Sequence, residues 1–514
     1  MRLFVAVCLL VTLPWTAALA VDVRVEGNAD AEAARIAEGV ADYLGDLEVA
    51  GAPFRYGDGI VVKALGGGRY RIIAPDLSIV AGNDEPSLAL GRLEIEAVSK
   101  GGGRYAYRLL PFAPIRIEAP GDAMTFQVRE QDVHGEWNAE LGVAMATTLI
   151  WRGVELVMSS GAVLKMELID STSQVALSSD GRTISNPSSA TIRGIEFDSP
   201  GMRASFAHVA MSMDVVDMSV EDYQRRLGFN AQMRFSPTLQ TPADMIEQIR
   251  DALGGGLGRE TTYVEATDVE FTMRSFVDGA ETRAVLPLIS GRQTVEDGYN
   301  YAITLNALRV DRIESGIATP IVTLDYFEGE SHTALDGADT VGSSQELRFR
   351  GLDVHGPYAF HVPGDGHLAF DAEAIPFAAL IEQRAAIGPM SEPSTLVPLL
   401  LGVLANSEGA LSLHALDLAN GGVTAALDSP VRYALSSRRF TTTPNRLEVR
   451  GLGGLVAQLV GNAGANQQLI GLLSIAMALG RPEVRNGENV HVYEFGNAPD
   501  GSLTINGRPI GGLQ

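Results

Sequence analysis

The sequence predicts a mainly β protein of the α+β class: a long antiparallel meander with a few buried amphipathic helices and repeated helix–hairpin units. Two observations carry this prediction. Apolar and polar residues alternate in short runs from Phe54 to Val216 and again from Tyr263 to Val362, as expected of strands with two different faces. Glycine clusters such as Gly66–Gly68 and Gly101–Gly103 separate the runs, as turns do.

The first segment, Met1–Ala20, has the features of a secretory signal peptide. Arg2 precedes the apolar run Leu3–Leu13, and the segment ends in Ala18-Leu-Ala, so cleavage is expected after Ala20. The alternative, an uncleaved anchor, is disfavoured because the apolar run is short for a span of ~20 residues. The single cysteine, Cys8, lies inside this segment. The mature chain therefore has no thiol for a disulfide, a nucleophile or a metal site.

Two further regions are expected: 21–236, a helix followed by antiparallel strands, and 237–514, which carries the helix–hairpin units. A boundary near Ser236–Thr241 is the best candidate, although one continuous sheet across it is the alternative. The first region opens with a helix over Asp30–Leu44 that Gly45 ends. Its later strands mix apolar residues on both faces, as in Trp151, Val154 and Leu156. This predicts either an open groove or a two-sheet sandwich.

Later helices are expected to begin and end at recognisable residues, the first of them still within region 21–236. Ser219–Asp222 has the form of a capping box. Thr241-Pro242 reads as an N-cap with a first-turn proline, and Gly254 ends that helix. A second helix is expected at Pro376–Arg384, followed by the apolar run Leu396–Leu404. Residues 411–431 and 490–510 align without a gap, which predicts that the helix–hairpin unit is repeated, with a looser third copy starting at Thr241.

The last helix, Gln467–Leu479, is apolar nearly all round, which is typical of a buried helix. We expect it to pack under the strands that follow it. Its apolar residues then belong either to the core or to the lining of an apolar ligand site, and truncating Leu472 should destabilise the protein strongly in the first case. The residues concerned are Leu469, Leu472, Leu473, Ile475 and Met477.

Charge and motif content exclude several functions. The net charge is −24 and no Lys/Arg run is present, so binding to nucleic acid is not expected. His355, His361 and His367 lie near Asp365, but prolines interrupt their spacing and no metal is expected. Gly451–Gly454 departs from a dinucleotide loop, and neither G-x-S-x-G nor S-x-x-K occurs. We therefore expect neither enzymatic activity nor a cofactor.

The stretch Asp500-Gly-Ser-Leu-Thr-Ile-Asn-Gly-Arg-Pro509 resembles the chain end of the YdgA-like family, uncharacterised envelope proteins of Gram-negative bacteria. The resemblance implies a periplasmic setting and supplies no catalytic residues. The sequence thus predicts an exported, periplasmic or secreted, non-catalytic protein that holds a lipid or another apolar ligand in a β-lined groove. The alternatives are a structural adaptor that binds an envelope protein partner, and a hydrolase with a site assembled from distant residues.

Overall fold

The structure is a computed structural model in which the chain forms two compact units. Unit 1 comprises Met1–Gln240 and Gly256–Glu281, and unit 2 comprises Thr241–Gly255 and Thr282–Gln514. Each unit is described by itself. The structure describes residues 23–26, 31–49, 54–56, 59–80, 86–119, 122–141, 143–220, 222–223, 242–253, 259–275, 279–296, 298–355, 363–387, 402–420, 423–441, 445–461, 467–485, 487–500 and 502–509. The predicted signal peptide, Cys8 and His361 lie outside this set.

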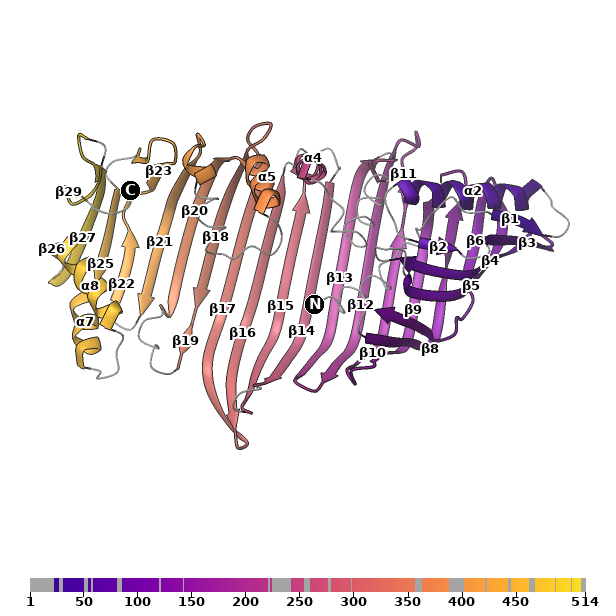
Figure 1. The fold of residues 1–514 in the computed structure, drawn as a ribbon, viewed down its shortest axis with the longest axis horizontal. Coiled ribbons are helices and arrows are strands. Elements are labelled where there is room, and N and C mark those ends of the chain that lie inside the picture. The colour runs from indigo at the N-terminus through magenta and orange to yellow at the C-terminus, as the bar shows by residue number, and fades with distance from the viewer. Residues whose placement is uncertain are drawn as a thin grey trace. The chain divides into compact units, whose positions relative to one another are not determined.

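Unit 1 is a β-sheet in which strands neighbouring in sequence mostly pair antiparallel (Figure 1). The edge strand β1 pairs parallel with β3. The order from β1 is β1-β3-β4-β5-β6-β8-β9-β10-β12-β13-β14. The short strands β2, β7 and β11 pair with β4, β8 and β12. The bounds are β1 Val23–Glu26, β2 Phe54–Tyr56, β3 Ile60–Gly66, β4 Arg69–Val80, β5 Pro86–Gly101, β6 Arg104–Leu109, β7 Ile115–Ala119, β8 Asp122–Asn138, β9 Val143–Met158, β10 Val163–Gln174, β11 Ala176–Leu177, β12 Thr183–Ser199, β13 Met202–Ser219 and β14 Arg259–Arg274.

Helix α2 (Ala31–Val49) covers a small aromatic core at one end of unit 1. It begins after Asp30 as predicted but continues past Gly45, so the predicted end was wrong. Ala33 and Ile36 pack with Val62 and Tyr105, all fully buried. A buried helix face held by tertiary packing outweighs the cost of about 1 kcal/mol for an interior glycine.

The long strands of unit 1 share one irregularity, which we call the kink row: Arg129, Gly153, Glu167, Gly194, Ala207 and Asp268. The strand registers place these residues opposite one another from β8 to β14. Gly153, Gly194 and Asp268 have φ of 60°, 59° and 49°. Every second strand thus carries a left-handed residue in the same line across the sheet.

The kink row reverses the side-chain alternation of each strand that it crosses. In β9, Leu149 and Trp151 are buried before Gly153, whereas Val154 and Leu156 are buried after it. The ring centroids of Trp151 and Phe126 lie 5.7 Å apart, and Phe126 pairs with Leu156 across the strands. These three side chains therefore share one face. The prediction that Trp151 and Val154 point to opposite faces was therefore wrong, because it assumed unbroken alternation.

Unit 2 is an antiparallel sheet with the order β16-β17-β18-β20-β21-β22-β25-β27-β26 (Figure 1). Short strands extend this order: β19 pairs with β17, β23 with β21, β24 with β23, β28 with β27 and β29 with β28. The bounds are β15 Glu281–Val295, β16 Tyr299–Glu314, β17 Ile317–Leu335, β18 Val341–Arg350, β19 Asp353–Val354, β20 Asp365–Ile375, β21 Ala410–Asn420, β22 Val423–Leu427, β23 Val431–Ala434, β24 Arg439–Phe440, β25 Asn445–Arg450, β26 Arg481–Arg485, β27 Glu488–Asn497, β28 Leu503–Ile505 and β29 Arg508–Pro509.

The kink motif of unit 1 recurs in unit 2. Ala307, Asp325 and Gly351 are opposite one another in β16, β17 and the link from β18 to β19. Ala307 and Gly351 have φ of 55° and 66°. The arrangement, a left-handed residue on each side of an acidic one, matches that of Gly153, Glu167 and Gly194. Both units therefore keep long strands apolar on one face by the same device.

The described part of unit 2 includes the helices α4 (Pro242–Leu253), α5 (Phe377–Ile387), α7 (Leu452–Gly461) and α8 (Gln467–Leu479). Helix α4 begins at Pro242 and ends before Gly254, as predicted. Helix α5 starts at its predicted place, while most of the run Leu396–Leu404 lies outside the described residues. In the described part of the chain, no helix is both long and apolar enough to cross a membrane.

The helix–hairpin repeat stays a prediction for two of its copies and is wrong for the third. Helices α7 and α8 precede β26, β27 and β28, and α5 precedes β21 and β22. The copy expected from Thr241 is divided, because α4 belongs to unit 2 whereas β14 belongs to unit 1. The chain thus changes unit at Gln240, close to the predicted boundary, and returns for β14. The predicted mainly β class is confirmed.

Candidate functional site

The most distinctive surface is one face of the unit 2 sheet, which we call the apolar face. Cross-strand pairing places its residues on one side, because directly paired residues of antiparallel strands point the same way. Leu305 pairs with Phe327, which pairs with Phe349. Ile303 pairs with Gly329, which pairs with Leu347. The apolar face comprises Ile303, Leu305, Phe327, Leu347, Phe349, Leu368 and Phe370.

Two glycines draw this face together. A Cβ on Gly329 would lie 3.3 Å from both Ile303 Cγ2 and Leu347 Cδ2. A Cβ on Gly366 would lie only 2.3 Å from Phe349 Cζ and 2.9 Å from Leu418 Cδ2. Neighbouring apolar side chains therefore lean over the glycines and form a smooth surface. A larger residue at Gly366 would push the Phe349 ring away from the sheet.

The apolar face is incompletely covered. Each of its seven residues is half-buried, and none belongs to the fully buried core. In unit 1, by contrast, Trp151, Leu156 and Ile169 are at most 2% exposed. A contiguous, partly exposed patch of large apolar side chains is unusual on a soluble protein and typically marks a binding surface. The predicted choice between an open groove and a two-sheet sandwich concerned the strands of region 21–236 and stays a prediction, while the partly exposed apolar surface lies in unit 2.

The opposite face of the same strands is charged, so the sheet is amphipathic. Arg348 bonds Glu328 at 3.4 Å and also contacts Glu346, which lies 2.7 Å from His367 Nε2. Farther along, His414 pairs with Asp371. Because these charges are paired laterally and exposed, they contribute little stability individually. They keep this face hydrated and distinguish it from the apolar one.

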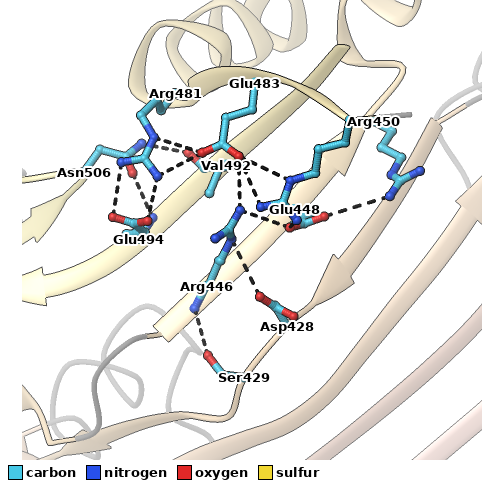
Figure 2. Close-up of polar contacts among 11 residues, drawn as sticks. Asp428, Ser429, Arg446, Glu448, Arg450, Arg481, Glu483, Val492, Glu494 and Asn506 are labelled. Carbon is cyan, nitrogen blue, oxygen red and sulfur yellow. Dashed lines mark hydrogen bonds and ion pairs between the residues drawn. The ribbon is translucent and has the colours of Figure 1, made fainter. Parts of the chain in front are cut away.

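A second cluster of polar residues lies on the charged face of β25, β26 and β27 (Figure 2). Arg446 is its centre, with its side chain 19% exposed and its Nη2 3.2 Å from Glu448 and 3.3 Å from Glu483. Arg485 contacts the same two glutamates. Arg481 lies 2.7 Å from Glu494, and the hydrogen bonds that it donates to Glu494 and Glu483 raise the pKa of Arg481. The cluster neutralises itself, so we interpret it as structural.

Helix α8, the predicted site element, is placed differently from the expectation. The side chains of Leu469 and Leu472 lie outside the described residues. Leu473 and Met477 are half-buried, and Met477 faces Gly453 of α7. Ile475 is 59% exposed. The prediction of burial on all sides was therefore wrong, because the helix packs on one side against α7 and β27 and leaves the other side open.

The C-terminal end of α8 is fastened to the sheet through polar contacts that sequence reasoning missed. Tyr493 donates its hydroxyl proton to the Ala476 carbonyl at 2.9 Å. Asn506 Nδ2 donates to the Leu479 and Val492 carbonyls, both at 2.8 Å, and its Oδ1 accepts from the Glu494 amide at 3.0 Å. Asn506 has φ of 50°, a conformation that asparagine tolerates better than most residues. Its signal in the sequence was the Asn-Gly pair within Asp500–Pro509.

Two of the histidines weighed as metal ligands, His355 and His367, have separate acidic neighbours in the described residues. His355 lies 3.5 Å from Asp353 and His367 lies 2.7 Å from Glu346. Asp365 instead accepts a hydrogen bond from the Gly351 amide at 2.9 Å. Over the ranges that the structure describes, no group of three or more His, Cys, Asp or Glu side chains is arranged to hold a metal ion.

Comparisons with known proteins give no information about the site. Neither a protein-family model, nor a curated protein, nor a solved structure matches this chain. The resemblance of Asp500–Pro509 to the YdgA-like family stays a prediction.

Proposed function

We propose that this chain is an exported, non-catalytic envelope protein that holds a lipid or another apolar ligand against the apolar face of unit 2. The half-burial of all seven residues of that face is the observation that carries the proposal. A ligand laid along Phe327, Leu347 and Phe349 would remove their exposed surface from water. Each buried methylene group of such a ligand would contribute about 0.8 kcal/mol.

The charge pattern favours an apolar ligand or a single acyl chain over an anionic molecule. The chain carries a net charge of −24, and the arginines on the opposite face of the same strands, such as Arg348, are engaged by glutamates. Specificity would come from the shape of the surface above Gly329 and Gly366. The face lies on paired strands, which hold the binding surface more rigidly than loops would.

The test of the ligand proposal compares two neighbouring residues of β16 that lie on opposite faces. Ile303→Lys places a charge on the apolar face, whereas Ala302→Lys places it opposite Glu330 on the charged face. Protein purified without detergent is examined by native mass spectrometry and by displacement of an uncharged apolar fluorescent probe. We expect Ile303→Lys to reduce bound ligand at least tenfold and Ala302→Lys to leave it unchanged. Equal binding by both variants, or no ligand in the parent protein, would contradict the proposal.

The proposed export has its own measurement. Intact-mass analysis of protein recovered from a bacterial periplasm should show a mature form that starts at Val21, because the charge, apolar run and Ala-Leu-Ala ending precede that residue. A dominant species that retains Met1–Ala20 would contradict cleavage. Ligand binding by a form expressed without those residues should be unaffected.

A further inference from the structure

The helical hairpin α7–α8 has a composition unlike that of the other helices in this protein. No charged residue occurs between Arg450 and Arg481. The exposed positions of α7 include Gly453, Ala457 and Val460, and those of α8 include Gly471, Ser474, Ile475 and Ala478. Val460 is 64% exposed and Ile475 is 59% exposed.

The other described helices provide an internal comparison. The exposed face of α2 carries Arg35 and Glu38, that of α4 carries Glu247 and Arg250, and that of α5 carries Glu382 and Arg384. A helix at a protein–water boundary normally presents charged and polar residues to water. Helices α7 and α8 present none that are charged, so their outer faces are suited to an apolar surrounding.

The polar groups of the hairpin are consistent with that surrounding. The Ser474 hydroxyl donates to the Ile470 carbonyl at 2.7 Å within α8, so it needs no partner from outside. The two helices contact each other along Gly453 and Met477. Small residues at helix–helix contacts are common in membranes, where close approach replaces the hydrophobic effect as the source of stability.

From these observations we infer that the outer face of the α7–α8 hairpin docks on a lipid membrane and inserts into its upper apolar layer. A second protein would be recognised by polar groups and aromatic anchors around an apolar centre, and the exposed positions named above supply neither. Helices of 10 and 13 residues are about 15 and 20 Å long. They are therefore shorter than the ~30 Å hydrocarbon core, which fits shallow insertion with the sheet remaining outside.

The charge of the chain specifies which membrane surface suits the hairpin. With a net charge of −24, anionic head groups repel the protein as a whole. The arginines that flank the hairpin, Arg450 and Arg481, are paired with Glu488 and Glu494. Binding should therefore come from apolar contact, be strongest on zwitterionic lipid, and increase when salt is added to anionic vesicles.

The test is flotation of the full chain with phosphatidylcholine vesicles. The vesicle-bound fraction of the double variant Val460→Asp, Ile475→Asp is expected to be at least tenfold lower than that of the parent. The control is Ile317→Asp at the start of β17, where the side chain is 70% exposed, and it should bind like the parent. Retained binding by the double variant, an equal loss in the control, or absence of parent binding would overturn the inference.

Two measurements keep the test decisive. Ile475→Cys in a Cys8→Ser background, labelled with a polarity-sensitive dye, should show a blue-shifted emission on adding vesicles, whereas labelled Ile317→Cys should not; no shift at either position would overturn the inference. Sedimentation velocity examines a second copy as the occupant. A dimer that the double variant converts to monomer, without any vesicle binding by the parent, would also overturn it. Because Ile303→Lys leaves the hairpin intact, that variant should still bind vesicles, which separates docking from ligand binding.

Discussion

Glu32, in the first turn of α2, is the polar centre of the small core in unit 1. Its Oε1 accepts hydrogen bonds from the Tyr105 hydroxyl at 2.9 Å and from Ser99 Oγ at 3.0 Å, while its Oε2 lies 3.1 Å from Arg35. Burial, followed by the hydrogen bond and charge of Glu32, raises the pKa of Tyr105 well above its usual range. The structure therefore requires this tyrosine to stay neutral.

This shift predicts a loss of stability at high pH. The unfolded chain releases the Tyr105 proton near the ordinary tyrosine pKa of about 10, whereas the folded chain retains it. The free energy of unfolding should then fall above pH 10 by up to about 1.4 kcal/mol per pH unit. Urea unfolding of the parent and of Tyr105→Phe between pH 8 and 11 measures this. The variant should show a shallower decline, and parallel curves would contradict the assignment.

Gly194 illustrates how strongly the kink row depends on single residues. Its φ is 59°, and a Cβ there would lie 2.9 Å from Glu167 Cβ. Gly194→Ala should cost about 1–2 kcal/mol for the left-handed backbone, and more for the displaced Glu167. The matched control is Gly161→Ala, since Gly161 has φ of 87° but open space around it. Thermal unfolding should show the larger loss at Gly194; equal losses would mean that Glu167 adjusts without cost.

At the scale of elements, the C-terminal strands hold helix α8 through Asn506. Replacing Asn506 by alanine removes one hydrogen bond to the end of α8 and two to β27. It also leaves alanine in a left-handed conformation without the compensating contacts. We expect a loss of about 1–3 kcal/mol and faster amide exchange in α8. Asn506→Gly keeps the backbone conformation and should lose less. Unchanged exchange in α8 in both variants would show that packing on α7 suffices.

Sequence reasoning succeeded where local chemistry determines the element. The alternation of apolar and polar residues predicted the strands, and Pro242 and Gly254 predicted where α4 begins and ends. It failed where the outcome depends on neighbours across the sheet: Gly153 is visible as a glycine, but Asp268 and Ala307 give no local sign of a left-handed conformation. The apolar face was missed for the same reason, since residues of four strands form it. The composition of α8 predicted its apolar character but not its open side.

At the scale of the whole molecule, the division into two units predicts unfolding in more than one step. Two of the three tryptophans, Trp137 and Trp151, lie in unit 1, and the third, Trp15, lies in the predicted signal peptide. Tryptophan emission should therefore follow unit 1, while far-UV circular dichroism follows both units. We expect two urea transitions that do not coincide between the probes.

Substitutions assign the two transitions. Gly194→Ala should shift only the one that tryptophan reports. Gly366→Ala, which would bring a Cβ to 2.3 Å from Phe349, should shift only the other. A single transition common to both probes, moved by either substitution, would instead show that the two units unfold together.

The alignment of the kink row fixes a common register for the strands of the unit 1 sheet. Glu167 is opposite both Gly153 and Gly194. Deleting one residue between Glu167 and either end of β10 would therefore shift Glu167 out of register with these glycines. The side chains of half the strand would then point to the opposite face of the sheet. Point substitutions carry no such penalty. Divergence of this protein should therefore preserve the distance from each kink to its turns while side chains change, and tolerated insertions should gather at the strand ends.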